Sequence, residues 1–240
     1  MKRFNWPTIR LLLMLALVIF LYSFTGKRNL NRKVTKAEVV FVGENQLFVK
    51  QQAVNKLLIE NRQDPKTIAI DALDLNKLEK TIDSHPLIDK SEVSVSVDGV
   101  LKAVVKQKTP IARINGKGDS FYIDYKGNKM PLSENYTARV LLVSGEINDK
   151  NKEDLAKLFR VIYDDVFLKK NIIGMQVMPN GSVLMLNRNY NFKIDFGQLI
   201  NVEQKFKNYK AFFQKVVLDS SIAEYKKIDL RFAEQVVCTK

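Results

Sequence analysis

Cysteine and histidine are almost absent from this 240-residue chain, which holds one of each, Cys238 and His85. A single cysteine cannot form a disulfide bond within the chain, and zinc sites of the cysteine and histidine type need several such ligands. The sequence also lacks a Gly-x-Ser-x-Gly elbow, a glycine-rich phosphate loop with lysine, and a His-Glu-x-x-His pair. We therefore predict a protein that is not an enzyme and has no metal or cofactor.

The remaining candidates for catalysis are weak. His85 precedes Pro86 and has no nucleophile motif beside it, so a capping or packing role is favoured over general-base catalysis. The paired carboxylates Asp164-Asp165 fall on the polar face of a predicted helix, where solvation is the default. Asp195 and Glu203 stand isolated in the sequence, and Cys238 is interpreted as a passive residue near the end of the chain.

Acidic residues are fewer than basic ones, 26 against 39, and the formal net charge is +13. Such a surface favours anionic surroundings: lipid headgroups, acidic cell-wall polymers or nucleic acid. The charges are scattered, however, and no basic and aromatic module for RNA or DNA is present. We therefore predict a solvated basic surface, no nucleic-acid partner, and an anionic cell-wall polymer as a candidate partner.

One long apolar run stands out, from Ile9 to Phe24, and it carries no charge between Leu11 and Tyr22. As a helix it covers roughly 24 Å, against about 30 Å for a hydrocarbon core. A cleaved signal peptide is the alternative, but the exit from the run has no Ala-x-Ala-like site. We predict an uncleaved anchor at 9–25, after a cytoplasmic tail at 1–8 and before a juxtamembrane linker at 26–36. The bulk of the chain then lies outside the cytoplasm.

After the linker, residues 37–108 form a β-α-α-β-β pattern. Alternating valines before and after Asp98-Gly99 indicate a hairpin, for which we predict a type I′ turn with two positive φ angles. Asp74 is suited to cap the second helix, and Thr109-Pro110 marks a boundary. The predicted elements are a strand at 39–42, a helix within 50–62, a helix from 75 to 82, and strands at 93–97 and 101–105.

Residues 109–240 mix strands with two amphipathic helices, at 150–168 and 201–217. Turns are predicted at Lys126–Asn128 and at Pro179–Gly181. The fold class is therefore α+β: one transmembrane helix, a β-α-α-β-β domain, and a mixed β-sheet domain with at least two helices. The predicted strands lie at 121–124, 140–143, 172–178, 182–186, 191–196 and 228–232.

The segment from Ser84 to Ile114 resembles the signature of the FtsQ/DivIB family of bacterial cell-division proteins. The resemblance rests on His85-Pro86, the valine-rich hairpin and Pro110–Ala112, and it continues in Phe121–Asp124 and in the tail Ile228–Phe232. It implies a POTRA domain followed by a β domain, in a single-pass protein of the inner membrane at the division septum. It further implies a non-catalytic scaffold that links early and late division proteins and helps to control septal peptidoglycan synthesis.

The resemblance also implies partners: FtsB/DivIC-like and FtsL-like division proteins, with other divisome components, docking at the terminal strand region. A sheet that ends with the last strand of a chain often has an unpaired edge, which can accept a partner's strand. Phe232, Val236 and Val237 are the expected contacts, with Arg231 and Glu234 at the rim, although Phe232 is equally suited to the core. The predicted partner-binding residues are Ile228, Leu230, Arg231, Phe232, Ala233, Glu234, Gln235, Val236 and Val237.

Two alternatives remain at this point. A signal-anchored envelope enzyme or glycan-binding protein that acts on the cell wall is compatible with the basic charge. A POTRA module of an outer-membrane assembly system is disfavoured, because no long tract of alternating barrel strands follows. The last POTRA strand, Leu101–Lys106, is a second candidate for an exposed edge.

Overall fold

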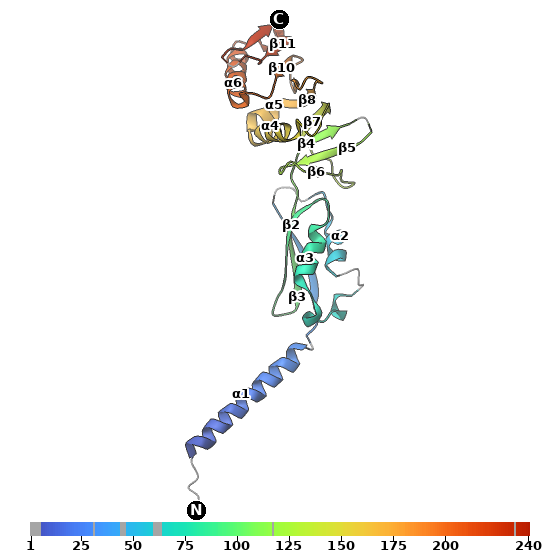
Figure 1. Cartoon of the computed structure of the whole chain (residues 1–240), viewed down its shortest axis with the longest axis vertical. Helices are drawn as coiled ribbons and strands as arrows, with labels where there is room; N and C mark the ends of the chain where they lie inside the picture. The colour runs from blue at the N-terminus through green and yellow to red at the C-terminus, as the bar shows by residue number, and fades with distance from the viewer. Residues whose placement is uncertain (1–5, 31, 44–46, 60–63, 117, 233) are drawn as a thin grey trace, which may run out of the picture. The chain divides into compact units, whose positions relative to one another are not determined.

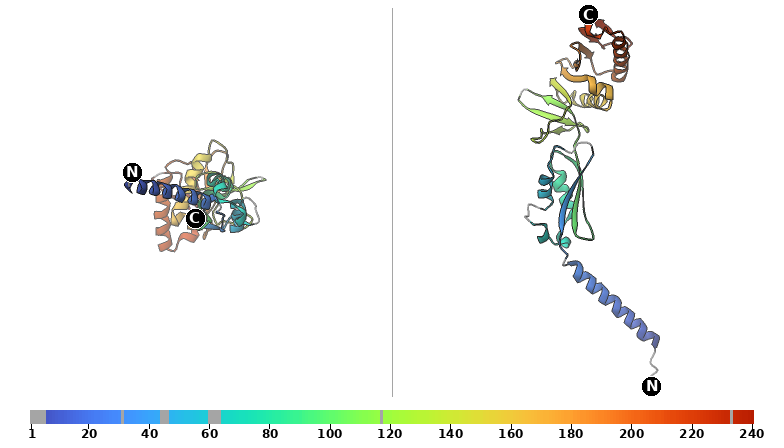
Figure 2. Two further views of the ribbon diagram at one scale, coloured as in Figure 1. Left: turned by 90° about the horizontal axis from the view of Figure 1, so that it is seen from below. Right: turned by 180° about the vertical axis from the view of Figure 1, so that it is seen from behind.

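The computed structural model describes residues 6–240 except 31, 44–46, 60–63, 117 and 233. The chain divides into two compact units, Met1–Gln107 and Lys108–Lys240. Figures 1 and 2 show the helices and strands of both units. Each unit is described by itself below.

Helix α1 (Trp6–Leu30) contains the candidate membrane span, Ile9–Gly26. With 25 residues it is longer than the predicted 9–25 segment, and at about 1.5 Å per residue it is long enough for the hydrocarbon core. Its apolar side chains from Leu11 to Phe24 are exposed, as expected for side chains that face lipid. Most of the predicted tail, residues 1–5, lies outside the described residues.

The rest of the first unit is a three-stranded sheet with two helices on one face (Figures 1 and 2). The sheet has the order β1-β3-β2, in which β3 runs parallel to β1 and antiparallel to β2. The POTRA-like order β-α-α-β-β is therefore present. Its elements are β1 (Lys36–Val42), α2 (Gln51–Leu58), the short 3₁₀ helices η1 (Pro65–Thr67) and η2 (Ile70–Ala72), α3 (Leu75–Asp83), β2 (Ile88–Val95) and β3 (Val100–Gln107).

This sheet order corrects one prediction. The segment Leu101–Lys106 belongs to β3, which is paired on both sides and is not an exposed edge. The alternation of Leu101, Ala103 and Val105 points these side chains into the core, where all three are fully buried. Strand β1 precedes α2 and α3 in the chain but pairs with β3, which follows them. Local sequence patterns do not reveal such a distant pairing partner.

The hairpin between β2 and β3 has a different turn from the one predicted. Of the described non-glycine residues, only Asn201 and Ser220 have positive φ, so Asp98 does not, whereas Gly99 has φ +80°. The Gly99 amide donates to the Ser96 carbonyl, and the Ser96 amide donates to the Val100 carbonyl. This is a type I turn closed by a glycine bulge, the usual three-residue hairpin loop.

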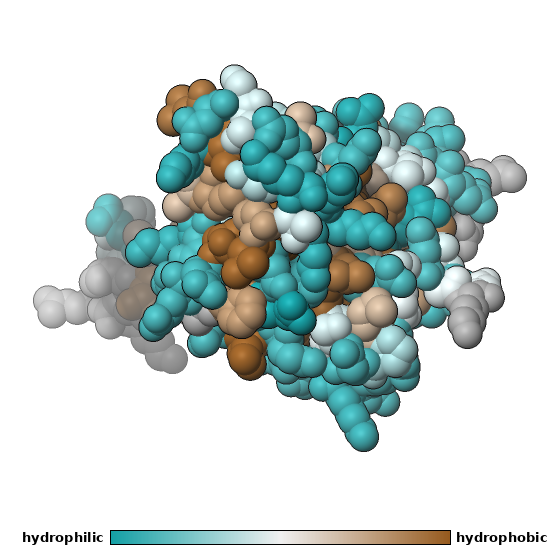
Figure 3. All heavy atoms as spheres, turned by 90° about the horizontal axis from the view of Figure 1, so that it is seen from above, coloured by the Kyte–Doolittle hydropathy of each residue, from teal (hydrophilic) through white to brown (hydrophobic). Residues whose placement is uncertain are grey.

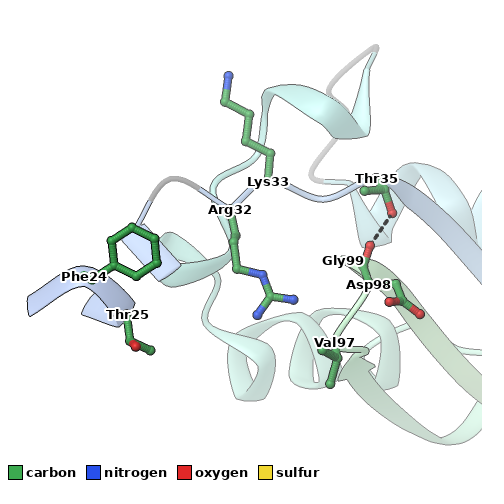
Figure 4. A pocket seen from close by; sticks show the side chains of 8 residues that line it. All are labelled: Phe24, Thr25, Arg32, Lys33, Thr35, Val97, Asp98 and Gly99. Carbon is green, nitrogen blue, oxygen red and sulfur yellow. Dashed lines mark hydrogen bonds between the residues drawn. The ribbon is translucent and has the colours of Figure 1, made fainter. Parts of the chain in front are cut away.

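Other local predictions for the first unit agree with the structure. The Asp74 carboxylate accepts the Lys77 amide at 3.0 Å and caps α3. Helix α2 ends at Leu58, and residues 60–62 of the predicted helix lie outside the described residues. Near the linker, the Thr35 hydroxyl donates to the Asp98 carbonyl at 3.1 Å, which fastens the hairpin turn to the start of β1 (Figure 4).

The second unit is built on a nine-stranded mixed sheet in the order β12-β11-β10-β9-β8-β7-β4-β5-β6. Neighbouring strands are parallel at β4–β7, β7–β8 and β10–β11, and antiparallel elsewhere. The strands are β4 (Pro110–Asn115), β5 (Ser120–Asp124), β6 (Lys129–Met130), β7 (Leu141–Gly145), β8 (Ile172–Val177), β9 (Val183–Asn187), β10 (Lys193–Gly197), β11 (Lys227–Asp229) and β12 (Val237–Thr239).

Helices cover one face of this sheet (Figures 1 and 2). Phe192, Ile194 and Phe196 point into the core beneath them and are 0–1% exposed, as their alternation predicts. On the other face Leu142 and Leu186 remain 48% exposed. The helices are α4 (Lys152–Asp164), α5 (Val166–Asn171), α6 (Val202–Leu218) and the short 3₁₀ helix η3 (Ile222–Glu224).

The predicted helix at 150–168 is two helices, which corrects the sequence-based prediction. Asp165 has extended backbone angles, and its carboxylate accepts the Leu168 amide at 2.9 Å, so it ends α4 and caps α5. The break turns Val166 outward, and it is 68% exposed. Aspartate competes well for a backbone N–H at a helix start, and this explains a break that the apolar spacing alone does not reveal.

Asp164 and Asp165 therefore have separate environments. Asp164 accepts a hydrogen bond of 2.9 Å from the Tyr125 hydroxyl, which raises the pKa of Tyr125. Asp165 forms a close ion pair with Lys210. Burial raises the pKa of Asp165, but the bonds from Lys210 and Leu168 outweigh this and lower the pKa overall.

Strand β4 is absent from the sequence-based prediction, which placed only a boundary at Thr109-Pro110. Pro110 is the first residue of β4, a position in which proline is tolerated, and the strand itself lies between β7 and β5. The turn at Pro179–Gly181 agrees with the prediction, because the Gly181 amide donates to the Met178 carbonyl and Gly181 has φ +79°.

Candidate partner-binding edge

The end of the chain forms two short strands where one was predicted. The predicted strand 228–232 ends at Asp229, the chain turns, and it returns as β12. Strand β11 is consequently paired on both sides, by β10 and by β12, and β12 forms the margin of the sheet. Within the described residues, no strand pairs with the outer side of β12.

The hydrogen-bonding direction identifies the open peptide groups of β12. The Leu230 amide donates to the Asp195 carbonyl of β10 at 2.8 Å, so the peptide groups of Ile228, two residues earlier, also face β10. Cys238 is the partner of Ile228 in the antiparallel register. Because peptide groups in such a pair alternate in direction, the N–H and C=O of Cys238 face the open edge.

The predicted partner-binding residues differ in their exposure to solvent. Ile228 and Leu230 are 0% and 1% exposed and support the edge from within the core. Phe232 is 47% exposed and Val237 is 42% exposed, so Phe232 is a surface residue and not part of the core. Arg231, Glu234 and Gln235 are exposed, Val236 is half-buried against the core, and Ala233 lies outside the described residues.

Apolar side chains on this part of the protein are interspersed with polar ones. In Figure 3 hydrophobic residues form several separate spots among hydrophilic residues on the face shown. Phe232 and Val237 are exposed, and so are the polar residues Glu234 and Gln235 between them in the chain. Such a surface suits main-chain recognition supplemented by a few side-chain anchors.

A comparison with protein families identifies the matched part of the chain. The family model described as "FtsQ/DivIB, C-terminal related" matches residues 109–239, more than half of the chain. This chain belongs to the FtsQ/DivIB family. The match includes all strands of the nine-stranded sheet, from β4 to β12. No curated protein matches the chain.

Four charged side chains on β10, on β11 and just after β11 contact one another in this FtsQ/DivIB protein. Lys227 lies 2.9 Å from the Asp195 carboxylate, and Arg231 contacts both oxygens of Asp229 at 2.5–3.0 Å. Arg231 lies 3.7 Å from Asp195 as well, so Asp195 is not isolated, contrary to the sequence-based prediction. Residues distant in the chain come together here because β10 and β11 are parallel neighbours.

The surroundings of Asp229 and Cys238 shift the pKa of each side chain. The hydrogen bonds from Arg231 lower the pKa of Asp229 more than burial raises it. Burial and the nearby Asp229 carboxylate raise the pKa of the Cys238 thiol. Asp229 is therefore ionised at neutral pH, and the Cys238 thiol is favoured in its protonated form.

The backbone conformation of Gly197 at the end of β10 leaves space for the Arg231 side chain. Gly197 has φ +69°, and a Cβ there would lie 2.7 Å from the Cγ of Arg231, so the arginine stem occupies space that only glycine leaves. The guanidinium then extends toward Asp229 and lies 6.0 Å from the ring centre of Phe232. Beside it, a hollow of about 430 Å³ is lined by Arg231, Asp195 and Lys205, among others.

Lys205 is the most buried cation of this region, at 2% exposure. Its ammonium group donates to the Phe196 and Gln198 carbonyls at 2.9 and 2.8 Å, and burial lowers its pKa. It thus binds the carbonyl groups at the end of β10. In the described part of the chain, no group of three or more histidine, cysteine or acidic residues is placed to hold a metal ion.

His85 lies in the first unit. Its Nδ1 accepts the Leu87 amide at 3.2 Å, just after the end of α3. This contact lies within the turn between α3 and β2, and it does not cap α3, whose last carbonyl groups need donors and not an acceptor. Strand β12 was missed by the sequence reading, although Val236, Val237 and Thr239 supply a β-branched signal that could have found it.

Proposed function

We propose that this protein is a non-catalytic scaffold of the cell-division machinery, held in the cytoplasmic membrane by α1. Membership of the FtsQ/DivIB family supports a role in cell division, and the candidate span supports a single-pass membrane protein. In this proposal the bulk of the chain lies outside the cytoplasm at the division septum. It links early and late division proteins there and helps to control septal peptidoglycan synthesis.

The observation that carries the proposal is the open margin of β12. A partner strand added there gains main-chain hydrogen bonds from Cys238 and apolar contacts from Phe232 and Val237. FtsB/DivIC-like and FtsL-like division proteins are the proposed partners. Arg231 and Glu234 lie at the rim, and the buried Ile228 and Leu230 keep β11 in place.

Replacing Cys238 with proline tests this mode of binding. Proline removes the outward N–H of residue 238 but leaves the inward bonds of its neighbours, and edge strands tolerate proline in this orientation. We expect Cys238→Pro to weaken capture of the FtsB/DivIC-like partner by the full chain about tenfold, since one partner carbonyl loses its donor. Phe232→Asp should weaken it as well, through lost apolar contact.

The matched control is Cys238→Ala, which removes the side chain but keeps the N–H, and it should bind like the wild type. Unchanged partner capture by folded Cys238→Pro and Phe232→Asp variants would refute this binding edge. A fluorescent protein fused to the N-terminus tests the cellular role separately. Fluorescence spread evenly around the envelope, without a band at midcell, would refute the division role even if the edge binds a strand.

A further inference from the structure

Four cationic side chains gather around one hollow of the second unit, away from the C-terminal edge strand. Arg113 lies on β4, Arg139 precedes β7, Lys169 lies on α5 and Arg188 follows β9. All four line a hollow of about 300 Å³, and among the described residues no aspartate or glutamate lines it. Apolar side chains make up much of the remaining wall, among them Ile111, Leu141, Ile162 and Ile172.

Arg113 is the least exposed of these cations. Its Nε is buried and has no hydrogen-bond acceptor within the described residues. A buried N–H without an acceptor destabilises a fold, and in native proteins such a group usually binds water or an ion. The strand register places Arg113 between Tyr122 on β5 and Leu142 on β7, so β4 cannot readily turn the side chain elsewhere.

The other three cations are held at the same hollow by separate contacts. Arg188 donates from Nε to the Lys170 carbonyl at 2.7 Å, and this leaves its terminal nitrogens available. The Lys169 ammonium lies 3.6 Å from the centre of the Tyr163 ring. The Ala138 amide donates to the Tyr122 hydroxyl at 3.0 Å, which holds the segment that carries Arg139.

None of the four forms an ion pair with a described carboxylate. This distinguishes them from the paired cations of the same unit, such as Lys210 with Asp165 and Lys227 with Asp195. Four unpaired positive charges at one site repel each other and attract an anion. Arg113, the least exposed of the four, lines the hollow together with apolar side chains, which lower the local dielectric constant there and so strengthen that attraction.

We propose that this hollow binds a phosphate group, as free phosphate or as the ester of a lipid headgroup or a cell-wall polymer. Guanidinium groups offer paired N–H donors that match phosphate oxygens, and a phosphate ester presents more acceptor oxygens than a single carboxylate. Arg113 then gains the acceptor that its Nε lacks. Arg139, Arg188 and Lys169 complete the site from the rim, and the apolar walls contact the uncharged part of an ester.

Calorimetric titration of the full chain in an uncharged detergent tests the proposal. The probes are inorganic phosphate, a glycerol phosphate oligomer and dihexanoyl phosphatidylglycerol below its micelle concentration. We expect binding of at least one probe at about 20 mM salt and much weaker binding at about 300 mM, because salt screens exposed charges. The double variant Arg139→Ala/Arg188→Ala should lose about tenfold or more in affinity.

The matched control is Lys207→Ala, which removes an exposed cation on α6 and should bind like the wild type. If the oligomer binds most tightly, the hollow is a site for a polymer; if the lipid binds most tightly, it is a site for a lipid headgroup. Equal affinities for the three probes identify a site for free phosphate. Each of these results supports the proposal. Failure of all three probes to bind, or equal losses in the double variant and the control, overturns it. Preferential binding of an acidic peptide, added as a further probe, overturns it too.

Discussion

The ion pair between Asp229 and Arg231 gives the sharpest test of how the terminal edge is held. Asp229 is 7% exposed, and its carboxylate accepts three side-chain bonds and the backbone N–H of Arg231. Replacing it with asparagine keeps the size and one acceptor oxygen but removes the charge. Charge-assisted hydrogen bonds contribute about 1.5–3 kcal/mol each. Because solvent reaches Arg231, we expect Asp229→Asn to reduce the stability of the edge by about 1–2 kcal/mol at pH 7.

The effect should disappear in acid. The folded pKa of Asp229 is lowered from its ordinary value of 3.8, so this carboxylate stabilises the folded state above that value. The stabilisation is lost as the pH falls through the folded pKa, when Asp229 becomes protonated and neutral. Wild type and Asp229→Asn should therefore differ fully at neutral pH and converge progressively below about pH 4.

Hydrogen exchange of the segment that contains β11 and β12 measures this local stability. After correction for intrinsic rates, a loss of about 1–2 kcal/mol corresponds to exchange roughly 5 to 30 times faster at pH 7. Glu203→Gln, at an exposed position of α6, is the control and should leave these rates unchanged. A difference between wild type and Asp229→Asn that persists undiminished at pH 2 would show that packing, and not charge, holds the edge.

Two further predictions concern other parts of the fold, and both are checked by urea unfolding of the full chain in detergent. Gln107→Ala should destabilise the first unit by about 2–4 kcal/mol. The buried side-chain amide of Gln107 accepts hydrogen bonds from the Phe48 and Val49 N–H groups and donates one to the Val49 carbonyl, and the variant loses all three. An effect below about 0.5 kcal/mol would contradict this prediction. Gly145→Ala should destabilise the second unit by more than about 2 kcal/mol, since Gly145 has φ +102° and a Cβ would lie 2.0 Å from the Val177 carbonyl oxygen. A wild-type unfolding curve for Gly145→Ala would refute the backbone geometry at the end of β7.

Local patterns in the sequence were sufficient where a residue and its near neighbours decide the structure. The apolar run predicted α1, alternating valines predicted the hairpin strands, and Asp74 predicted a helix cap. A prediction was wrong where a side chain competes with the helix for a backbone N–H group. Asp165 captures the Leu168 amide and divides a helix that apolar spacing alone suggests is continuous.

The pairing of distant strands could not be predicted in this way. Periodicity shows which face of a strand is buried but not which strand lies beside it. For this reason Leu101–Lys106 was expected at an edge and lies at the centre of its sheet. For the same reason the sequence did not predict that Asp195 lies near Asp229, or that Arg113 and Arg188 line one hollow. These residues come together only through the pairing of strands that are distant in the chain.

The sequence by itself determined that the protein carries one long apolar segment, two αβ regions and a terminal strand signal around Ile228–Phe232. Those features depend on composition and on spacings of two to four residues, which each stretch of chain carries alone. Only the tertiary structure decided that the chain reverses after Asp229 and that β12 is the open margin. It also decided that Phe232 is exposed while Ile228 and Leu230 are buried. These properties depend on which strands pair across the sheet, and that choice is made by the whole fold.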